Sequence, residues 1–523
     1  MPKAVGKEKR LSKDLPIVVI GGGIGGLSSA LDLASSGLEV IVIEKEHNLG
    51  GKIRQVFSAG QGIDSGPTVF TMRWVFDDLF EKAGSSLEQE LNIDLLKVLA
   101  RHAWSKDEKL DLFSNREKSA QAIARFSSTA EANRFHQFCD QIHALYRTLE
   151  KPYMLSQRPS LTSMMSDLGT AGSKVLMDIG LFSNLWKSLE KYFHDPRLQQ
   201  LFARYATYCG SSPFQAPATL MLIAEVEMQG VWSVQGGMIA LTQAISKLAE
   251  QKGVRFMKGV NCEEILQSAG KVSGVRLNNG DTIHCESLIF NGDVAALSAG
   301  LLGDANRSAI PSVKSKNRSL SALTWSMTAK TEGFPLLRHN VFFNTDYRSE
   351  FSDIFDYGRL PRRPTVYVCA QDQYDTAVQH DTPERLLCLV NAPALGDRQQ
   401  PKQDEIEACK TQTFSLLERC GLNIQMQDAQ VVQTSPTQFN QLFPATGGAL
   451  YGQANHGWME TFKRPSALSS IKGLYLAGGS VHPGAGVPMA ALSGRMAAAS
   501  LMAHLGLTKR SNRVLISGGI STL

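Results

Sequence analysis

The sequence lacks any long uninterrupted hydrophobic run, although 43% of its 523 residues are hydrophobic. A membrane-spanning helix needs about 18 or more consecutive apolar residues, so none is expected. The first fifteen residues are rich in lysine and contain no apolar segment of the kind that forms a secretory signal peptide. We therefore expect a cytoplasmic protein whose length provides a core for two or three domains.

Cysteine is sparse as well, and it is not arranged for cross-links or metal binding. The eight cysteines include no Cys-x-x-Cys pair and have no histidine partner at zinc spacing, which predicts reduced thiols and no metal site. The net charge is only +5, and the lysines and arginines are dispersed. Because no motif combines aromatic and basic residues, this small charge argues against a nucleic-acid partner.

What the sequence does contain is a dinucleotide-binding pattern over Ile17–Gly51. An apolar run leads into a turn with Gly21, Gly23 and Gly26, and a helix-like stretch and a second apolar run follow. The glycines allow a tight turn and close approach to a pyrophosphate, and the helix N-terminus offers it free N–H groups. Glu44 ends the second apolar run, where a carboxylate accepts hydrogen bonds from an adenosine ribose.

A second glycine pair favours a flavin over a nicotinamide cofactor. Gly50 and Gly51 come shortly after the acidic residue, and Lys52, Arg54 and the glycine-rich stretch 62–67 follow. Glycines let the chain pass close to the diphosphate again, and the cations beside it neutralise the phosphates. Nicotinamide dehydrogenases rarely need this second wrap. The pattern resembles the flavin-containing amine oxidase and phytoene desaturase superfamily, which implies an extended and deeply enclosed FAD.

The C-terminal segment 473–495 supplies a matching second half. Leu474 to Ala477 predict a buried strand, a glycine-rich loop follows, and a helix is expected to begin near Val487. A helix N-terminus aimed at the flavin stabilises negative charge on its pyrimidine end. His482 lies in the loop, where we expect it to shape the backbone or touch the cofactor at most. Residues 478–480 are Gly-Gly-Ser, so the acidic residue that many relatives place there for the ribityl chain is missing.

Five further segments resemble the carotenoid desaturases of the bacterial phytoene desaturase type. Within that group they are most similar to the 1-hydroxycarotenoid 3,4-desaturases, also called methoxyneurosporene dehydrogenases. The resemblance extends from about residue 16 to about residue 505. The segments are Asp64-Ser-Gly-Pro-Thr-Val-Phe-Thr-Met-Arg-Trp-Val75, Arg204-Tyr-Ala-Thr-Tyr-Cys-Gly-Ser-Ser-Pro213, Gln229-Gly-Val-Trp-Ser-Val-Gln-Gly-Gly-Met238, Phe290-Asn-Gly-Asp293 and His482-Pro-Gly-Ala-Gly-Val-Pro488.

The motifs and the resemblance together imply a set of FAD-binding residues. They occupy the glycine-rich turns, the end of the second strand and the first turn of the C-terminal helix. The predicted residues are Gly21, Gly22, Gly23, Gly25, Gly26, Glu44, Lys45, Gly50, Gly51, Lys52, Gly66, Pro67, Thr68, Val260, Gly478, Gly479, Val487, Pro488 and Met489.

The expected fold class is α/β, with a Rossmann-type FAD-binding domain interleaved with a β-sheet substrate domain and a helical, membrane-facing subdomain. Apolar residues at helical spacing over Glu131–Leu149 and 183–208 indicate the helical part, and the Asn279-Gly280 pair predicts a hairpin. The predicted ranges are FAD-binding parts at 16–90, 231–300 and 446–508, a helical part at 91–230, a substrate domain at 301–445, and tails at 1–15 and 509–523.

The chemistry follows from the substrate that the resemblance implies. A saturated carbon pair beside a polyene has no acidic proton, so we expect hydride loss to the flavin, followed by proton loss from the delocalised cation. The protein then has mainly to hold the chain and exclude water, and no dedicated acid or base is expected. Glu225 and Glu227 remain candidates for such a role. The resulting activity is the introduction of a C3–C4 double bond into acyclic 1-hydroxy carotenoids.

Three polar residues near the family's substrate segments are predicted to bind the substrate, namely Arg204, Tyr205 and Tyr208. The tyrosines can pair with a tertiary alcohol at the end of the polyene. Helix capping or packing is the structural alternative for each of them.

The segment Phe182–Phe193 is expected to meet the lipid surface. Its leucine, tryptophan and phenylalanine side chains suit the bilayer interface, with two lysines at headgroup level, although core packing explains the spacing equally well. A lipophilic carotenoid has to enter from the bilayer, so we expect a peripheral protein on the cytoplasmic face of the bacterial inner membrane. Quinone or oxygen is the expected electron acceptor.

Two other functions remain open from the sequence. One is a phytoene-type desaturase that introduces several double bonds. The other, of a different class, is a non-catalytic isoprenoid-binding escort protein with a related fold and no functional flavin. The intact second glycine pair and the complete C-terminal loop favour the enzyme.

Overall fold

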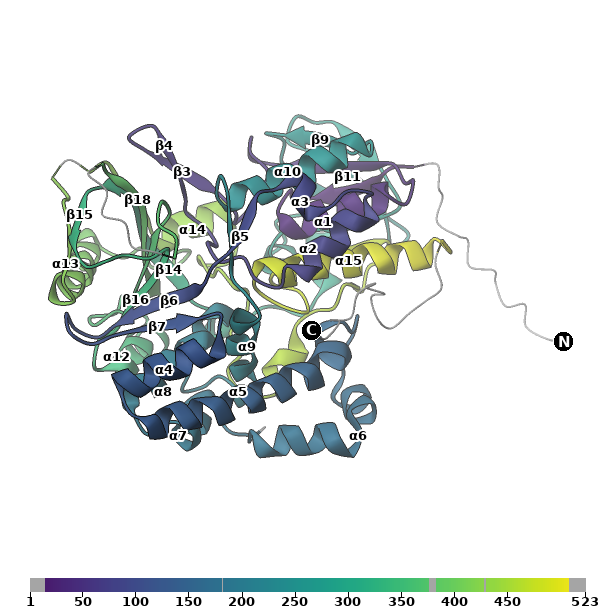
Figure 1. The fold of residues 1–523 in the computed structure, drawn as a ribbon. Helices are drawn as coiled ribbons and strands as arrows, with labels where there is room; N and C mark the ends of the chain where they lie inside the picture. The colour runs from purple at the N-terminus through teal and green to yellow at the C-terminus, as the bar shows by residue number, and fades with distance from the viewer. Residues whose placement is uncertain (1–14, 181, 376–381, 428, 508–523) are drawn as a thin grey trace.

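The computed structural model describes residues 15–180, 182–375, 382–427 and 429–507. Figure 1 shows two α/β bodies side by side, one around α1 and α15 and one around β14 and β18, with helices α4 to α8 beneath them. Almost all of the two predicted tails lies outside the described residues. The predicted α/β class, with an FAD-type domain interleaved with a sheet domain, is confirmed.

The first body is built on a five-stranded parallel sheet drawn from three distant parts of the chain. All strand pairs are parallel, and four of the five strands are short buried apolar runs, whereas the edge strand β9 is partly exposed. In spatial order the strands are β21 (Leu474–Leu476), β13 (Leu288–Phe290), β1 (Ile17–Ile20), β2 (Val40–Glu44) and β9 (Arg255–Lys258).

Three helices pack closely in this body, namely α1 (Ile24–Ala34), α10 (Met238–Gln251) and α15 (Val487–His504). The backbones of α1 and α15 approach so closely that a Cβ on Gly494 would lie 1.9 Å from the carbonyl oxygen of Gly25. Arg495 on α15 also forms ion pairs with Asp32 on α1 and with Asp78 on α2 (Trp74–Lys82). These contacts hold the N-termini of α1 and α15 next to each other.

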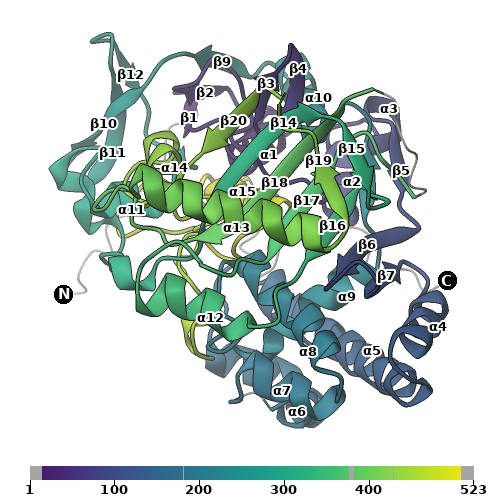
Figure 2. The same cartoon turned by 90° about the vertical axis from the view of Figure 1, so that its left-hand side faces the viewer.

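The second body is a seven-stranded mixed sheet. One face packs under α13 (Gln403–Arg419) around Trp325, Val366 and Cys388, and Figure 2 shows α13 lying across it. On the opposite face, Ser326 and Thr328 of β14 hydrogen-bond Ser65 and Ser58 on the cofactor side, and the β16–β7 end packs against the helical part. The strands in order are β20 (Val431–Thr434), β14 (Ser321–Ala329), β18 (Glu384–Ala392), β17 (Val366–Ala370), β16 (His339–Phe342), β6 (Val98–Ala103) and β7 (Lys109–Phe113).

The stretch 91–113 corrects the expectation of a helical part beginning at residue 91. It forms β5 (Ile93–Leu95), which pairs with β8 (Trp232–Val234), and then β6 and β7, which extend the seven-stranded sheet. Short apolar runs do not reveal by periodicity whether they are helix or strand. Their strand conformation depends on distant partners, since β5 pairs with β8 and β6 pairs with β16, more than 220 residues further along the chain.

Helices make up most of the lower part of the molecule in Figure 1. The predicted helix over 131–149 is confirmed, and the stretch 183–208 divides into three pieces because Asp195 caps a new helix with Pro196 in its first turn. No helix among the described residues is long and apolar enough to cross a bilayer. The helices are α4 (Arg116–Phe126), α5 (Thr129–Leu149), α6 (Leu161–Asp178), α7 (Leu185–Tyr192), α8 (Pro196–Ala203), the 3-10 helix η2 (Arg204–Cys209) and α9 (Leu222–Met228).

The remaining elements connect these parts. The hairpin predicted at Asn279-Gly280 is confirmed, because β11 pairs antiparallel with β12. The connecting elements are β3 (Gln55–Ser58), β4 (Gln61–Asp64), α3 (Leu87–Glu90), β10 (Cys262–Ser268), β11 (Lys271–Leu277), β12 (Thr282–His284), α11 (Val294–Ser298), β15 (Thr331–Gly333), α12 (Tyr347–Phe351), η6 (Ser352–Asp356), β19 (Leu422–Ile424) and α14 (Pro436–Leu442).

Candidate cofactor and substrate site

The first glycine turn joins β1 to the N-terminus of α1. Gly21 has a positive φ of 98° and donates its N–H to the carbonyl of Ile43 at 2.8 Å. A Cβ on Gly26 would lie 2.1 Å from the carbonyl oxygen of Gly21, so a side chain is excluded there. Helix α1 has no side-chain cap and no acidic residue in its first turn. Its free N–H groups and positive dipole end are therefore available to an anion.

Glu44 lies against this turn at the end of β2. Its Oε2 accepts the N–H of Gly22 at 2.7 Å, and its Oε1 accepts the N–H of Glu46 at 2.9 Å. The residue is 6% exposed. Two backbone donors thus orient the carboxylate beside the turn where the ribose of a dinucleotide is expected. The N–H of Val260 donates to the carbonyl of Glu44 at 3.1 Å, so Val260, which is also predicted to bind FAD, lies beside Glu44.

The second glycine pair touches the first turn directly. Gly50 donates its N–H to the carbonyl of Gly22 at 2.8 Å, and a Cβ on Gly51 would come within 3.1 Å of the Cα of Gly23. The structure therefore brings both glycine turns to one place, as the motif predicts.

The two predicted lysines take different positions. Lys52 is half-buried, and its ammonium donates to the carbonyl of Leu450 at 2.6 Å. Desolvation lowers the pKa of this lysine, an effect that the nearby Asp293 opposes. Lys45 is exposed at about a third of its side-chain surface and donates to the carbonyl of Leu442 at 2.7 Å. Of the two, Lys52 is the cation enclosed with the glycine turns.

The C-terminal glycine loop closes over the same turns. A Cβ on Gly25 would lie 3.2 Å from the amide nitrogen of Gly478. Helix α15 begins at Val487, which with Pro488 and Met489 forms its first turn, and it too has no side-chain cap and no acidic residue there. The helix start predicted near residue 487 is confirmed. Two uncapped helix N-termini therefore converge on one site.

His482 does not take part in an acid–base arrangement. Its Nε2 lies 3.1 Å from the carbonyl oxygen of Tyr153, and the two rings meet edge to face at 5.0 Å. Burial lowers its pKa to about 4, so the ring is neutral at physiological pH. The geometry matches the expected backbone-shaping role, because His482 ties the loop to the helical part.

Three residues of this site escaped the sequence prediction. Asn291 donates its amide to the carbonyl of Gly21 at 3.1 Å, and Arg464 donates to the carbonyl of Gly479 at 3.0 Å. Asp293 caps α11 and keeps one buried carboxylate oxygen without a hydrogen-bond partner. Asn291 and Asp293 follow β13 directly, and polar residues after a parallel strand are a signal for such sites. Arg464 lies in a loop without a comparable signal.

These residues fit an FAD molecule. Two uncapped helix N-termini and the enclosed Lys52 suit a pyrophosphate, and the oriented carboxylate of Glu44 suits a ribose. The unpartnered oxygen of Asp293 is a free acceptor in the same region. It offers an acidic contact that Gly478-Gly479-Ser480 does not supply.

The loop after β4 connects the cofactor body with the seven-stranded sheet. Gly66 packs so tightly that a Cβ there would lie 1.8 Å from the carbonyl oxygen of Lys52. Pro67 and Thr68 follow Gly66 in the chain. The hydroxyl of Thr68 forms a hydrogen bond with the phenol of Tyr367 on β17 at 2.7 Å. The predicted residues 66–68 thus lie where the cofactor body faces the polar side of the sheet.

The predicted substrate residues form one buried polar cluster. Tyr205 and Tyr208 both donate their hydroxyls to the carboxylate of Glu227, the first at 2.6 Å. Arg204 donates to Glu227 at 3.2 Å and to the hydroxyl of Tyr208 at 3.0 Å. Arg204, Tyr205 and Glu227 are each less than a tenth exposed, and the Nε of Arg204 has no partner. Burial and the nearby carboxylate raise the pKa of both tyrosines.

Glu225 does not belong to this cluster. It lies on α9 with its carboxylate 2.9 Å from the Nδ1 of His143 on α5, and that histidine side chain is 62% exposed. Of the two acidic candidates, only Glu227 is brought together with Arg204 and the tyrosines.

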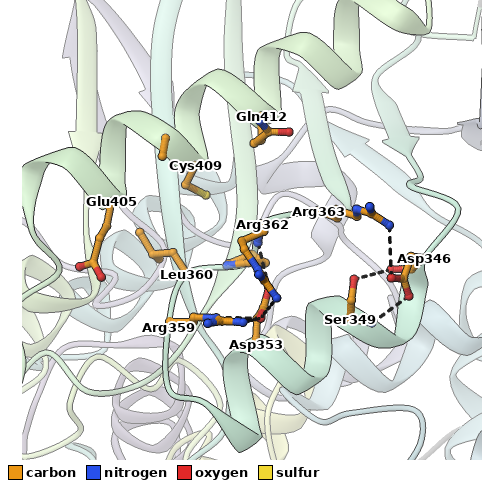
Figure 3. A pocket seen from close by; sticks show the side chains of 12 residues that line it. Asp346, Ser349, Asp353, Arg359, Leu360, Arg362, Arg363, Glu405, Cys409 and Gln412 are labelled. Carbon is orange, nitrogen blue, oxygen red and sulfur yellow. Dashed lines mark hydrogen bonds and ion pairs between the residues drawn. The ribbon is translucent and has the colours of Figure 1, made fainter.

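A hollow of about 650 Å³ lies elsewhere, between η6 and α13. Figure 3 shows Arg359 and Arg362 directed at Asp353, and Arg363 directed at Asp346. Helix α13 covers the face of the sheet opposite the cofactor body. The hollow is therefore separate from the candidate site, and its three arginines are already paired.

Comparison with known proteins agrees with this geometry. The family model described as "Flavin containing amine oxidoreductase" matches residues 24–502. A protein named hydroxyneurosporene desaturase from Rubrivivax gelatinosus is 57% identical, covering 97% of this chain and 97% of its own length. A protein of the same name from Cereibacter sphaeroides is 41% identical over 94% of this chain and 99% of its own length.

A solved structure supports the fold alone. Cyclohexylamine oxidase from Brevibacterium oxydans superposes with a TM-score of 0.57 at 14% identity, covering 94% of this chain and 100% of the oxidase. At this identity the likeness shows that the arrangement of the two bodies is shared.

Proposed function

The chain belongs to the flavin containing amine oxidoreductase family, and we propose that it introduces the C3–C4 double bond into acyclic 1-hydroxy carotenoids. The observation that carries the proposal is the 57% identity, along nearly the whole of both chains, to a protein named hydroxyneurosporene desaturase. A buried polar cluster beside a flavin-type site supports the choice of a substrate that is apolar except at one end.

FAD is held by the two glycine turns, Glu44, Lys52 and the first turn of α15. When bound there, FAD would supply the hydride acceptor for the allylic carbon of the substrate. The two helix N-termini of the chain stabilise negative charge at this site.

The cluster of Arg204, Tyr205, Tyr208 and Glu227 forms the polar end of the substrate site in this proposal. Both oxygens of Glu227 are engaged by donors, so we assign this carboxylate the task of orienting the tyrosines. The phenol of Tyr205 donates to Glu227 and keeps its acceptor lone pairs for the substrate hydroxyl, whereas that of Tyr208 already accepts from Arg204 and keeps one. Proton loss from the cation then needs no dedicated base, because water or a backbone oxygen suffices.

Entry from a lipid bilayer is the proposed route for the substrate. Phe182 is 74% exposed and Met177 at the end of α6 is 75% exposed. The ring of Phe182 meets that of Trp458 edge to face at 5.2 Å. The other apolar residues expected at the lipid surface are not available to it, because Leu185, Leu189 and Phe193 are buried in the core. The proposed contact therefore rests on Phe182 and Met177 alone. We therefore place the protein peripherally on the cytoplasmic face of the bacterial inner membrane, with quinone or oxygen as electron acceptor.

Product analysis tests the proposal directly. The enzyme is produced in cells that make 1-hydroxyneurosporene and, separately, in cells that make only phytoene. We expect a new C3–C4 double bond in the first strain and no lycopene in the second. Conversion of phytoene to lycopene would establish the multistep phytoene-type alternative instead.

A further inference from the structure

Several buried polar atoms on the sheet face opposite α13 have no hydrogen-bond partner. Among the described residues these include the Nε2 atoms of His339 on β16 and His102 on β6, and the Oγ1 of Thr324 on β14. His339 is only 3% exposed. Buried polar groups without a hydrogen-bond partner are rare, because leaving one unpaired destabilises the folded protein. Such a group is therefore a candidate for binding a ligand.

His339 is the one of these groups that is linked to the cofactor loop. Its Nδ1 lies 2.7 Å from the phenol oxygen of Tyr367, which in turn hydrogen-bonds the hydroxyl of Thr68 at 2.7 Å. The rings of His339 and Tyr367 are stacked at an interplanar angle of 19°. This chain of contacts fixes the plane of the imidazole and leaves Nε2 free.

The charge of Arg204 in the polar cluster also acts on the imidazole, as it does on that of His102. Burial, followed by the charges of Arg338 and Arg204, lowers the pKa of His339 to about 3. The ring is therefore neutral at physiological pH, and Nε2 is either a donor or an acceptor according to the tautomer. A hydroxyl group pairs with either form.

The position of the hydroxyl on the proposed substrate requires a partner close to the flavin. The oxygen on C1 is separated from C3 by only three single bonds of about 1.5 Å each. Whatever binds it must therefore lie close to the reacting carbon. Tyr205 and Tyr208 already donate their hydroxyls to Glu227, and that of Tyr208 also accepts from Arg204. The tyrosines can therefore only accept from the substrate hydroxyl, and the oxygen of that hydroxyl still needs a hydrogen-bond donor.

We propose that the Nε2 of His339 hydrogen-bonds the 1-hydroxyl group of the substrate and thereby makes His339 a specificity-determining residue. The inference rests on the proposed function, because it concerns the polar end of the same carotenoid. The hydrogen bonds from Thr68 to Tyr367 and from Tyr367 to His339 then fix the distance between the substrate hydroxyl and the Thr68 loop, which belongs to the predicted cofactor site.

Four variants test this role: His339→Leu, His339→Gln, Tyr367→Phe and, as a matched control, His102→Leu. His102 is fully buried on the same face and also has an unpartnered Nε2, but it contacts the carbonyl of Leu110 and not the Thr68 loop. Binding of 1-hydroxyneurosporene and of neurosporene is measured in detergent by the shift of the carotenoid absorption band. FAD content is measured from the flavin spectrum.

We expect His339→Leu to lower the preference for the hydroxylated carotenoid about tenfold or more with unchanged FAD content. His339→Gln should retain part of the preference, Tyr367→Phe should lower it to an intermediate value, and His102→Leu should leave it unaltered. Full preference in His339→Leu, or a loss equal to it in His102→Leu, would overturn the inference. If wild-type protein shows no preference for the hydroxylated carotenoid, the proposed function itself fails.

Discussion

The carboxylate of Glu44 accepts a hydrogen bond from the backbone N–H of Gly22 at 2.7 Å. This contact joins the end of β2 to the glycine turn between β1 and α1, so the acidic residue is oriented by the turn that binds the phosphates. Glu44 therefore has two roles, since it holds the glycine turn in place and is predicted to bind the ribose. A test of ribose binding has to be separated from an effect on the turn.

Replacing Glu44 with alanine should weaken FAD binding by about 1.5–3 kcal/mol, the range for hydrogen bonds to a charged acceptor. Glu44→Gln keeps an acceptor for the N–H of Gly22 and should show a smaller loss. Titration of the apoprotein with FAD, followed by flavin fluorescence, gives both affinities. Unchanged affinity in the alanine variant would falsify the assignment.

The buried arginine between α1, α2 and α15 should be important for stability. Arg495 is 2% exposed and lies 3.1 Å from Asp32 and 2.5 Å from Asp78. Arg495→Met leaves two buried carboxylates without this partner, and we expect the free energy of unfolding to fall by about 3–5 kcal/mol.

Urea unfolding of the FAD-bound protein measures this loss. Arg307→Met is the matched control, since Arg307 forms an exposed ion pair with Asp304 at 2.7 Å, and exposed pairs contribute about 1 kcal/mol or less. Equal effects of the two substitutions would contradict the role of the buried group.

Glu350 should make stability depend on pH. Burial raises the pKa of this carboxyl from 4.5 to about 7, although it accepts hydrogen bonds from the N–H of Thr365 and the amide of Asn391. Because the folded-state pKa is the higher one, its stabilising contribution is complete below pH 4.5 and is lost as the pH rises to about 7.

Comparison with Glu350→Gln isolates that dependence. The free energy of unfolding of the wild type should fall relative to the variant over this interval, by at most about 1.4 kcal/mol per pH unit. Urea midpoints measured at several pH values give the two curves. Parallel curves would show that Glu350 does not titrate in this range.

The tyrosines of the polar cluster should contribute to substrate preference. Changing Tyr205 and Tyr208 together to phenylalanine removes both phenol oxygens while keeping the rings. We expect the preference for hydroxylated over unhydroxylated carotenoid to fall about tenfold, which corresponds to roughly 1.4 kcal/mol, with FAD content unchanged. Competition between the two substrates, with Tyr192→Phe as control, measures the ratio. A full preference in the double variant would remove the tyrosines from hydroxyl recognition.

The exposed apolar side chains near α6 and α7 should govern membrane binding. Changing Phe182 and Met177 to serine should reduce the fraction of protein that floats with liposomes. Phe57→Ser is the matched control, because Phe57 is 68% exposed but belongs to the β3–β4 hairpin at the other end of the molecule in Figure 1. Equal loss with Phe57→Ser, or no loss with the double variant, would exclude this surface as the contact.

The amino-acid sequence by itself determined the cofactor half of this protein. The glycine turns, Glu44 at the end of β2 and the start of α15 near Val487 all follow from short-range rules. A turn that excludes a Cβ requires glycine, and a buried parallel strand requires an apolar run. Such requirements act within a few residues of the chain, so they are readable without the fold.

Only the tertiary structure decided how the substrate half is assembled. The short strands β6 and β7 exist because they pair with β16 and with each other. The same pairing places His339 beside Tyr367, and the packing of the two bodies brings Thr68 to them. Glu227 joins Arg204 while Glu225, two residues earlier, contacts His143. These contacts link positions that lie far apart in the chain or on different faces of a helix, so their energies depend on packing that no local pattern records.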